Sequence, residues 1–216
     1  MLSTKQRYKQ VIDYFLIHQP IAETELIYIT PYQLMVAVIL SAQCTDKRVN
    51  IITPAFFKKF PDFLALSKAE IPEIFDLIRS CSYPNNKTKN LSAGAKFIIG
   101  NFNGDLPSTH EDLLKIPGIG RKSANVLLSV VYNKPAMAVD THVFRVSARI
   151  GLTTNAKTPY ETEMQLIENI PEDKIAIAHH WLILHGRYIC IARKPLCDKC
   201  GINRYCKYFS KIDKHK

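Results

Sequence analysis

Apolar residues recur at three- and four-residue intervals along most of this chain, and this helical spacing constrains the fold more than any other feature. The pattern is clear in residues 8–16, 34–39 and 56–60. It continues in residues 71–79, 86–101, 109–115, 122–132, 141–150, 160–169 and 173–188. Prolines fall mostly at the starts of these segments or between them. Since no alternating run bounded by hairpin turns occurs, we predict an all-α protein.

The size and charge of the chain narrow the class further. Its 216 residues predict one compact body with two lobes. Lysine and arginine total 29 against 19 acids, a net charge of +10, which favours a nucleic-acid partner over the alternative of a merely basic protein. No apolar run approaches the ~18 residues that cross a bilayer. The polar N-terminus lacks the features of a secretory signal, so we expect a cytoplasmic protein with no membrane partner.

Four of the six cysteines crowd into one short segment near the C-terminus, namely Cys190, Cys197, Cys200 and Cys206. In a chain with no export signal, such a cluster indicates metal or iron–sulfur ligation before disulfides. Zinc sites usually pair their cysteines in two short knuckles, and only one such pair is present here, which favours a 4Fe–4S cluster. The other two, Cys44 and Cys81, stand alone in the sequence and are expected to be buried or inert thiols.

The first gap between these cysteines carries two adjacent cations, Arg193 and Lys194. Bound ligands would hold this loop rigid, and a rigid basic loop suits contact with a DNA phosphate. We therefore expect the cluster to have a structural, DNA-positioning role.

The segment Ile-Pro-Gly-Ile-Gly-Arg-Lys at residues 116–122 predicts a tight turn between two helices. Gly118 and Gly120 would allow backbone angles that a side chain forbids, and would bare amide N–H groups at the start of the next helix for a phosphate. These features suit a helix-hairpin-helix that grips DNA without reading its sequence. An ordinary helix connection with a glycine cap is the alternative.

Lys122 falls in the first turn of the helix that follows this hairpin, where the helix dipole opposes a cation. Partial desolvation there would favour the neutral amine that Schiff-base chemistry requires, although Lys122 could instead contact a phosphate. Asp140 lies where an apolar segment meets another helix. Its simplest role is a helix N-cap, and a compatible second role is to stabilise a positively charged sugar near Lys122.

Taken together, these residues resemble the endonuclease III family of DNA glycosylases with AP lyase activity. The resemblance runs from about Pro31 to Cys206. It includes Leu-Ser-Ala-Gln-Cys-Thr-Asp at residues 40–46, the hairpin at 116–122, Val-Asp-Thr-His at 139–142, His-Trp-Leu-Ile-Leu-His-Gly-Arg at 180–187 and the spacing of the four cysteines. It implies a six-helix module at residues 22–133 and a second lobe, formed by residues 1–21 and 134–216, around a 4Fe–4S cluster.

The resemblance also implies a function in base excision repair on double-stranded DNA that contains damaged bases or abasic sites. A damaged nucleotide, expected to be an oxidised pyrimidine, would be flipped into a groove between the lobes. Lys122 would attack the sugar at C1′ and expel the base, Asp140 would support the positive charge, and elimination of the 3′ phosphate would nick the strand. Gln43 would fill the gap left by the base, and the hairpin with Arg121 would hold the backbone. A monomer, associated with the nucleoid in a bacterium, is the simplest expectation.

One segment departs from the family pattern, which usually has Gly-aliphatic-Tyr-Asn in the loop that wedges into the opposite strand. Here Tyr83 stands where the aliphatic wedge is expected, and an aromatic ring could act there by stacking. Two alternatives remain. A monofunctional adenine-mismatch glycosylase usually lacks a lysine at the position of Lys122 and carries a further domain. A non-catalytic DNA-binding module would use the hairpin and a zinc site for architecture alone.

Overall fold

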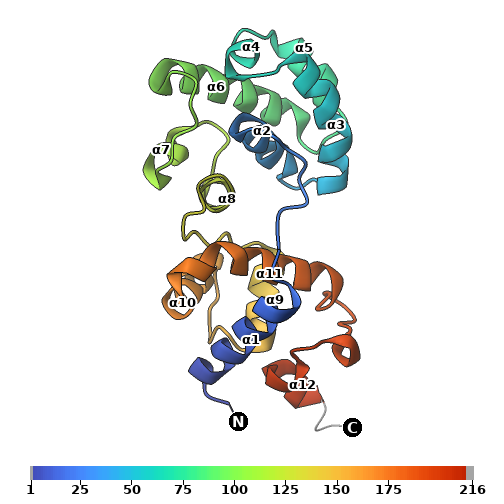
Figure 1. The fold of residues 1–216 in the computed structure, drawn as a ribbon. Helices are drawn as coiled ribbons and strands as arrows, with labels where there is room; N and C mark the ends of the chain where they lie inside the picture. Colours follow the sequence, from blue (N-terminus) through green and yellow to red (C-terminus); the bar gives the residue numbers. More distant parts are fainter. Residues whose placement is uncertain (1, 213–216) are drawn as a thin grey trace. The chain divides into compact units, whose positions relative to one another are not determined.

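The computed structural model describes residues 2–212, and every regular element among them is helical (Figure 1). The predicted all-α class is therefore confirmed. The chain divides into two compact units. Unit 1 joins its two ends, Met1–Glu23 and Asn133–Lys216, whereas unit 2 is the continuous segment Thr24–Tyr132.

Unit 2 is built around one helix that is buried on all sides. Its helices are α2 (Pro31–Ser41), α3 (Asp46–Lys59), α4 (Phe63–Ser67), α5 (Ile71–Ile78), α6 (Pro84–Phe102), α7 (His110–Lys115) and α8 (Arg121–Tyr132). Every residue of α2 from Leu34 to Leu40 is buried, as expected of a helix without a polar face. This helix contacts α3, α6 and α8. Thr30 caps its start by accepting a hydrogen bond from the Gln33 amide, 3.2 Å away.

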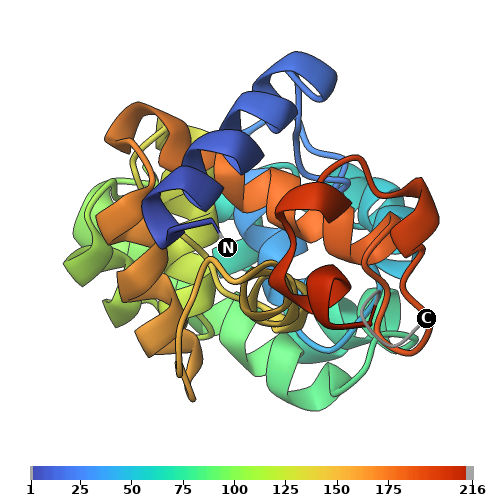
Figure 2. The ribbon, with the colours of Figure 1, turned by 90° about the horizontal axis from the view of Figure 1, so that it is seen from below.

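Unit 1 packs the N-terminal helix against the C-terminal half of the chain. Its helices are α1 (Thr4–His18), α9 (Thr141–Ile150), α10 (Pro159–Asn169), α11 (Ile175–Tyr188) and α12 (Lys207–Ile212), with the short 3₁₀ helices η1 (Glu172–Lys174), η2 (Cys197–Lys199) and η3 (Asn203–Tyr205). Figures 1 and 2 both show α1 beside α9 and α11.

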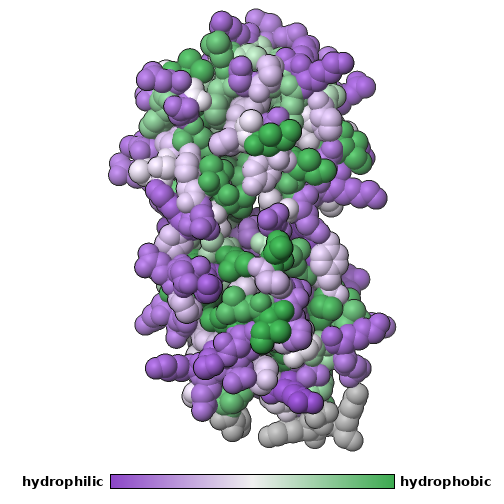
Figure 3. Space-filling model, in the orientation of Figure 1, coloured by the Kyte–Doolittle hydropathy of each residue, from purple (hydrophilic) through white to green (hydrophobic). Residues whose placement is uncertain are grey.

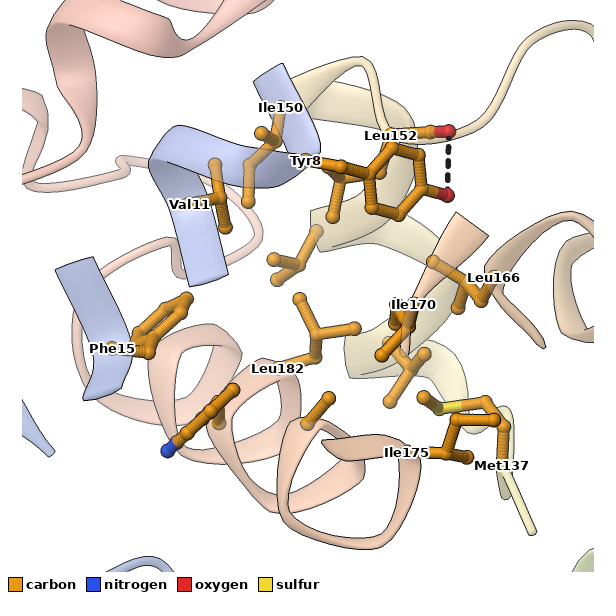
Figure 4. Close-up of a cluster of buried hydrophobic side chains, with 14 of the residues drawn as sticks. Tyr8, Val11, Phe15, Met137, Ile150, Leu152, Leu166, Ile170, Ile175 and Leu182 are labelled. Carbon is orange, nitrogen blue, oxygen red and sulfur yellow. Dashed lines mark hydrogen bonds between the residues drawn. The ribbon is translucent and has the colours of Figure 1, made fainter. Parts of the chain in front are cut away.

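One apolar core holds unit 1 together (Figure 4). Phe15 of α1 stacks on Trp181 of α11 with ring centroids 5.5 Å apart. Tyr8 buries its ring in the same core, and its hydroxyl donates a hydrogen bond to the Leu152 carbonyl at 2.9 Å. Fully burying one such large side chain stabilises a fold by roughly 1.5–3 kcal/mol, so these contacts fix α1 on the unit.

The surface drawn in Figure 3 carries mainly hydrophilic side chains, with apolar groups in small patches on each unit. Among the described residues, no helix is both long enough and apolar enough to cross a membrane.

Candidate functional site

A helical hairpin in unit 2 is formed by α7, residues 116–120 and α8. Thr109 caps α7 through a 3.1 Å bond from the Asp112 amide, so the first helix has a defined start. The turn is closed by a 3.0 Å hydrogen bond from the Ile119 amide to the Ile116 carbonyl. Both isoleucine side chains are buried, and they anchor the turn to the unit. The polar backbone of the turn is thereby held at the surface beside the start of α8.

The two glycines of this turn meet different demands. Gly118 has a φ of +88°, and a Cβ built on it would lie only 2.8 Å from the Cβ of Asn90 on α6. A side chain at this position would therefore meet both backbone strain and a clash. Gly120 has no such backbone angle, and nothing lies within 4 Å of a Cβ built there. The prediction that both glycines serve the turn's backbone angles is right for Gly118 and wrong for Gly120.

Lys122 lies in the first turn of α8, immediately beyond the hairpin. Its side chain is exposed, as is that of Arg121, so the partial desolvation of the amine expected from the sequence is not seen. The first helical hydrogen bond of this region runs from the Ala124 amide to the Gly120 carbonyl, at 2.9 Å. The amides of the first turn of a helix have no partner within the helix, so α8 presents donors on the same side as these two cations.

Two further loops of unit 2 lie against each other, the α2–α3 loop at residues 42–45 and the α5–α6 loop at residues 79–83. The Ser82 hydroxyl donates a hydrogen bond to the Gln43 carbonyl across them. Gln43 and Tyr83 are both exposed, and both have left-handed backbone angles, with φ of 54° and 55°. Residues 41–46 and 80–87, which are far apart in the sequence, thus form one surface of unit 2.

Asp140, in unit 1, is the N-cap of α9. Its Oδ1 accepts hydrogen bonds from the amides of His142 and Val143, each 2.8 Å long. The expected capping role is therefore confirmed, and it occupies one carboxylate oxygen. The apolar residues that precede Asp140, from Ala136 to Val139, are buried, so the carboxylate sits on a fixed backbone at the edge of the unit's core.

The four clustered cysteines all line one cavity of unit 1, together with apolar side chains that include Ile150, Ile189 and Phe209. Burial and the neighbouring thiols raise the pKa of Cys200 to about 11, so without a cation this sulfur remains protonated. Within the described part of the chain, no three His, Cys, Asp or Glu side chains are grouped to hold a single metal ion. The structure therefore gathers the four cysteines at one cavity, where they are possible ligands of a metal group.

The basic loop between the first two cysteines is held by arginines of α9. Arg149 donates hydrogen bonds to the carbonyls of Ile191 and Ala192, at 2.8 and 2.7 Å. Arg145 bonds in the same way to the Cys190 carbonyl, at 3.2 Å. The side chains of Arg193 and Lys194 remain exposed at the surface of this fixed loop.

Comparison with known proteins decides the family. The model of the HhH-GPD superfamily of base excision DNA repair proteins matches residues 36–172. Endonuclease III of Rickettsia felis is 43% identical over 201 residues, which cover 93% of this chain and 94% of that protein. Endonuclease III of Escherichia coli strain K12 is 37% identical over 196 residues, which cover 91% of this chain and 92% of that protein. The chain belongs to the endonuclease III family.

Solved structures agree with this assignment to the endonuclease III family. A trapped covalent intermediate of endonuclease III with DNA matches with a TM-score of 0.91 and 38% identity, over 99% of this chain and 100% of that one. A non-covalent endonuclease III–DNA complex matches with the same TM-score. The resemblance inferred from the motifs is confirmed, and with it the class of enzyme, a DNA glycosylase with AP lyase activity in base excision repair.

Reasoning from the sequence missed three features of this endonuclease III fold. The first is the pair of hydrogen bonds from Arg149 to the basic loop. The sequence around Arg149 does not distinguish it from any other cation on a helix. The buried Lys87 donates a 2.7 Å hydrogen bond to the Leu40 carbonyl at the end of α2, although its sequence context suggests a solvated helix face. Cys44 and Cys81, expected to stand alone, place their sulfurs 3.9 Å apart. Their 37-residue separation in the chain carries no sign of this contact.

Proposed function

We propose that this enzyme releases oxidised pyrimidines from double-stranded DNA through a Schiff base on Lys122. The observation that carries the proposal is the exposed amine of Lys122 on the first turn of α8, directly beside the hairpin. A related structure, 38% identical, is a trapped covalent intermediate of endonuclease III with DNA, and such an intermediate requires a nucleophile of this kind. DNA that covers the helix terminus would exclude water from the amine and from the sugar that it attacks.

The chemistry assigned to Lys122 has four steps. Its nitrogen attacks C1′ of the flipped nucleotide, and the base leaves with a proton. The sugar ring opens and an imine forms between C1′ and the lysine. Loss of a proton from C2′ then breaks the bond between C3′ and its oxygen, so the strand is cut on the 3′ side. Water finally hydrolyses the imine and frees the lysine. Asp140 supports the positive charge on the sugar and accepts a proton from the attacking amine.

DNA binding is assigned to the hairpin, to the two loops of unit 2 and to the basic loop of unit 1. The amides at the start of α8, the open space beside Gly120 and the Arg121 side chain suit a phosphate. Gln43 would fill the gap left by the flipped base, and Tyr83, which is 60% exposed, would stack on the opposite strand. Arg193 and Lys194 would contact other phosphates of the DNA backbone. This set requires no second copy of the chain, so we propose a monomer.

A 4Fe–4S cluster held by Cys190, Cys197, Cys200 and Cys206 is part of the proposal. Zinc sites usually hold their ion with cysteines paired in two short knuckles, and this cluster has one such pair, Cys197 and Cys200. Four cysteines around one cavity with apolar walls suit a larger inorganic group. When bound, the cluster would cross-link residues 190–206 and keep the basic loop in place.

Borohydride trapping tests the role of Lys122. Sodium borohydride reduces an imine to a stable amine, so the wild-type enzyme should give a covalent adduct with a duplex that contains an abasic site or an oxidised pyrimidine. Lys122→Ala should give none. Lys115→Ala is the matched control, since Lys115 lies on α7 of the same hairpin and pairs with Asp112 at 3.0 Å. An equal yield of adduct from Lys122→Ala would remove this residue from its role.

A further inference from the structure

The two unit 2 loops that carry Gln43 and Tyr83 meet at a pair of thiols. Cys44 lies in the α2–α3 loop and Cys81 in the α5–α6 loop, and their sulfurs are 3.9 Å apart. A disulfide requires about 2.05 Å between sulfurs, so closure needs a movement of roughly 2 Å shared between the loops. We refer to these two residues as the thiol pair.

Backbone hydrogen bonds position each member of the thiol pair. The Cys44 amide donates to the Ser41 carbonyl at 3.0 Å, and the Cys81 amide donates to the Ile78 carbonyl at 2.8 Å. The hydrogen bond from Ser82 to Gln43 joins the same loops one residue away from each thiol. The contact between the sulfurs is therefore part of a fixed junction and not a chance approach of two mobile side chains.

The surroundings of the thiol pair suit stepwise oxidation. Cys81 is only 4% exposed, whereas Cys44 is partly exposed and can be reached from solvent. Two cations, Lys87 and Arg48, act electrostatically on Cys81 and lower the pKa of its thiol, but the effect of burial is larger. Burial, together with the neighbouring Cys44, raises the pKa of Cys81 to about 11. Cys44 is therefore the thiol that meets an oxidant first, and Cys81 is the one that resolves the product.

We propose that Cys44 and Cys81 form a reversible redox-modification site whose oxidant is a hydroperoxide. The Cys44 sulfur attacks the peroxide oxygen, which forms a sulfenic acid and releases water or an alcohol. The Cys81 sulfur then attacks the Cys44 sulfur, which forms the disulfide and releases a second molecule, water. Two thiols are thus oxidised and one peroxide is reduced. A dithiol reductant restores both thiols by exchange and leaves as its own disulfide.

The consequence for repair rests on the proposed roles of Gln43 and Tyr83. Gln43 immediately precedes Cys44, and Tyr83 follows Cys81 by two residues. A disulfide would draw the two loops together and hold them at one separation, so neither side chain could settle into the duplex. A displacement of about 1 Å at a reacting complex can cost a factor of roughly 100 in rate. We therefore expect the oxidised enzyme to cut a damaged duplex roughly 10- to 100-fold more slowly.

The bond itself is tested without any assay of activity. The holoenzyme is treated with a low concentration of hydrogen peroxide, its remaining thiols are alkylated, and its peptides are mapped by mass spectrometry. The expected product is a peptide containing residue 44 joined to one containing residue 81, and it should disappear with dithiothreitol. Cys44→Ala should lack the cross-linked peptide, and so should Cys81→Ser. Independent oxidation of both thiols in the wild type, with no cross-link, would overturn the proposal.

Incision assays then test the consequence. Peroxide should slow incision of a damaged duplex by the wild type, dithiothreitol should restore it, and the double variant Cys44→Ala, Cys81→Ala should resist. Equal peroxide sensitivity of the double variant would place the loss elsewhere, for example at the clustered cysteines, whose iron content is measured in parallel. An active oxidised enzyme with a mapped disulfide would overturn the regulatory consequence. Failure of the reduced wild type to cut any damaged duplex would instead overturn the proposed function.

Discussion

Gly118 and Gly120 lie in the same turn, yet substitution by alanine should affect them differently. Gly118→Ala adds a methyl group 2.8 Å from the Asn90 Cβ and places it on a left-handed backbone, so we expect a loss of about 1–3 kcal/mol in the free energy of unfolding. Gly120→Ala meets open space and should change stability by less than about 0.5 kcal/mol. Because the proposed phosphate contact lies beside this residue, Gly120→Ala should weaken DNA binding several-fold.

Urea unfolding and binding to a labelled duplex, measured on both variants, separate these effects. A loss of stability in Gly120→Ala but not in Gly118→Ala would contradict the conclusion that only Gly118 is required by the backbone and by packing. The sequence alone could not distinguish the two glycines, because the need at Gly118 arises from Asn90 on another helix. In the same way, Gln43 and Tyr83 have left-handed angles in two loops that are distant in the chain and are joined by a hydrogen bond.

At the scale of the element, Asp140 caps α9 and is also proposed to act in catalysis. Two substitutions at this residue separate the capping role from the catalytic role. The asparagine side chain retains an oxygen that accepts hydrogen bonds, so Asp140→Asn should keep the stability of the protein and its binding to DNA while turnover falls at least 100-fold, roughly the contribution of a general base. Asp140→Ala should in addition lose about 1 kcal/mol of stability. Single-turnover kinetics and thermal unfolding measure the two effects, and full turnover by Asp140→Asn would leave Asp140 as a cap only.

The helices show what periodicity can predict. The segment expected at residues 141–150 matches α9, Thr141–Ile150, and the other segments predicted from residue 71 onward agree with their helices to within two residues at each end. The short helices α4 and α12 were not predicted. Pro54 is an exception among the prolines, since it lies inside α3. The rest of α3 compensates through packing, with Val49 and Phe56 fully buried on either side of it.

Helix α11 should make the stability of the protein depend on pH. Burial lowers the pKa of His180 from 6.5 to about 4, and the ring of its titratable neighbour His179 lies 4.8 Å away. Between these two values the unfolded chain binds a proton that the folded protein does not, so stability is present above about pH 6.5 and falls as the pH decreases towards 4. His180 alone should account for a loss of about 2 kcal/mol at pH 5.

The variant His180→Gln is the control for this pH effect, because glutamine is polar but does not titrate near neutral pH. Denaturant unfolding at about pH 7 and about pH 5 should show a smaller difference for the variant than for the wild type. Equal differences in the two proteins would mean that His180 does not carry the pH dependence.

At the scale of the whole molecule, the motifs predicted the family and the fold because several separate segments each carried part of the pattern in the right order. The motifs could not predict which residues that are distant in the sequence come close together in the fold. Lys122 belongs to unit 2 and Asp140 to unit 1, so their joint action on one sugar stays a prediction. The contact between Cys44 and Cys81 lies within one unit and was still hidden, because no local rule links a loop after α2 to a loop after α5.

The division into units predicts which part of the chain would respond to loss of the proposed 4Fe–4S cluster. The cysteine cavity lies entirely within unit 1, and Arg7 of α1 donates a 2.9 Å hydrogen bond to the Tyr205 carbonyl beside it. Removal of the proposed cluster should leave four half-buried thiols without a common partner and loosen the backbone around them. Hydrogen exchange should therefore accelerate in residues 189–212 and at the start of α1, while α2 and α8 keep their protection because their core is separate.

Mass-resolved hydrogen exchange of the iron-loaded and iron-depleted protein measures this difference, and Cys197→Ser provides a second route to the depleted state. Exchange that accelerates equally in both units would mean that the cluster supports the whole molecule. Unchanged exchange near Cys197 would mean that Arg145 and Arg149 alone hold the basic loop. With the expected result, depleted protein should still fold unit 2 and present the hairpin with Lys122, but should bind DNA more weakly, because Arg193 and Lys194 would no longer be held in place.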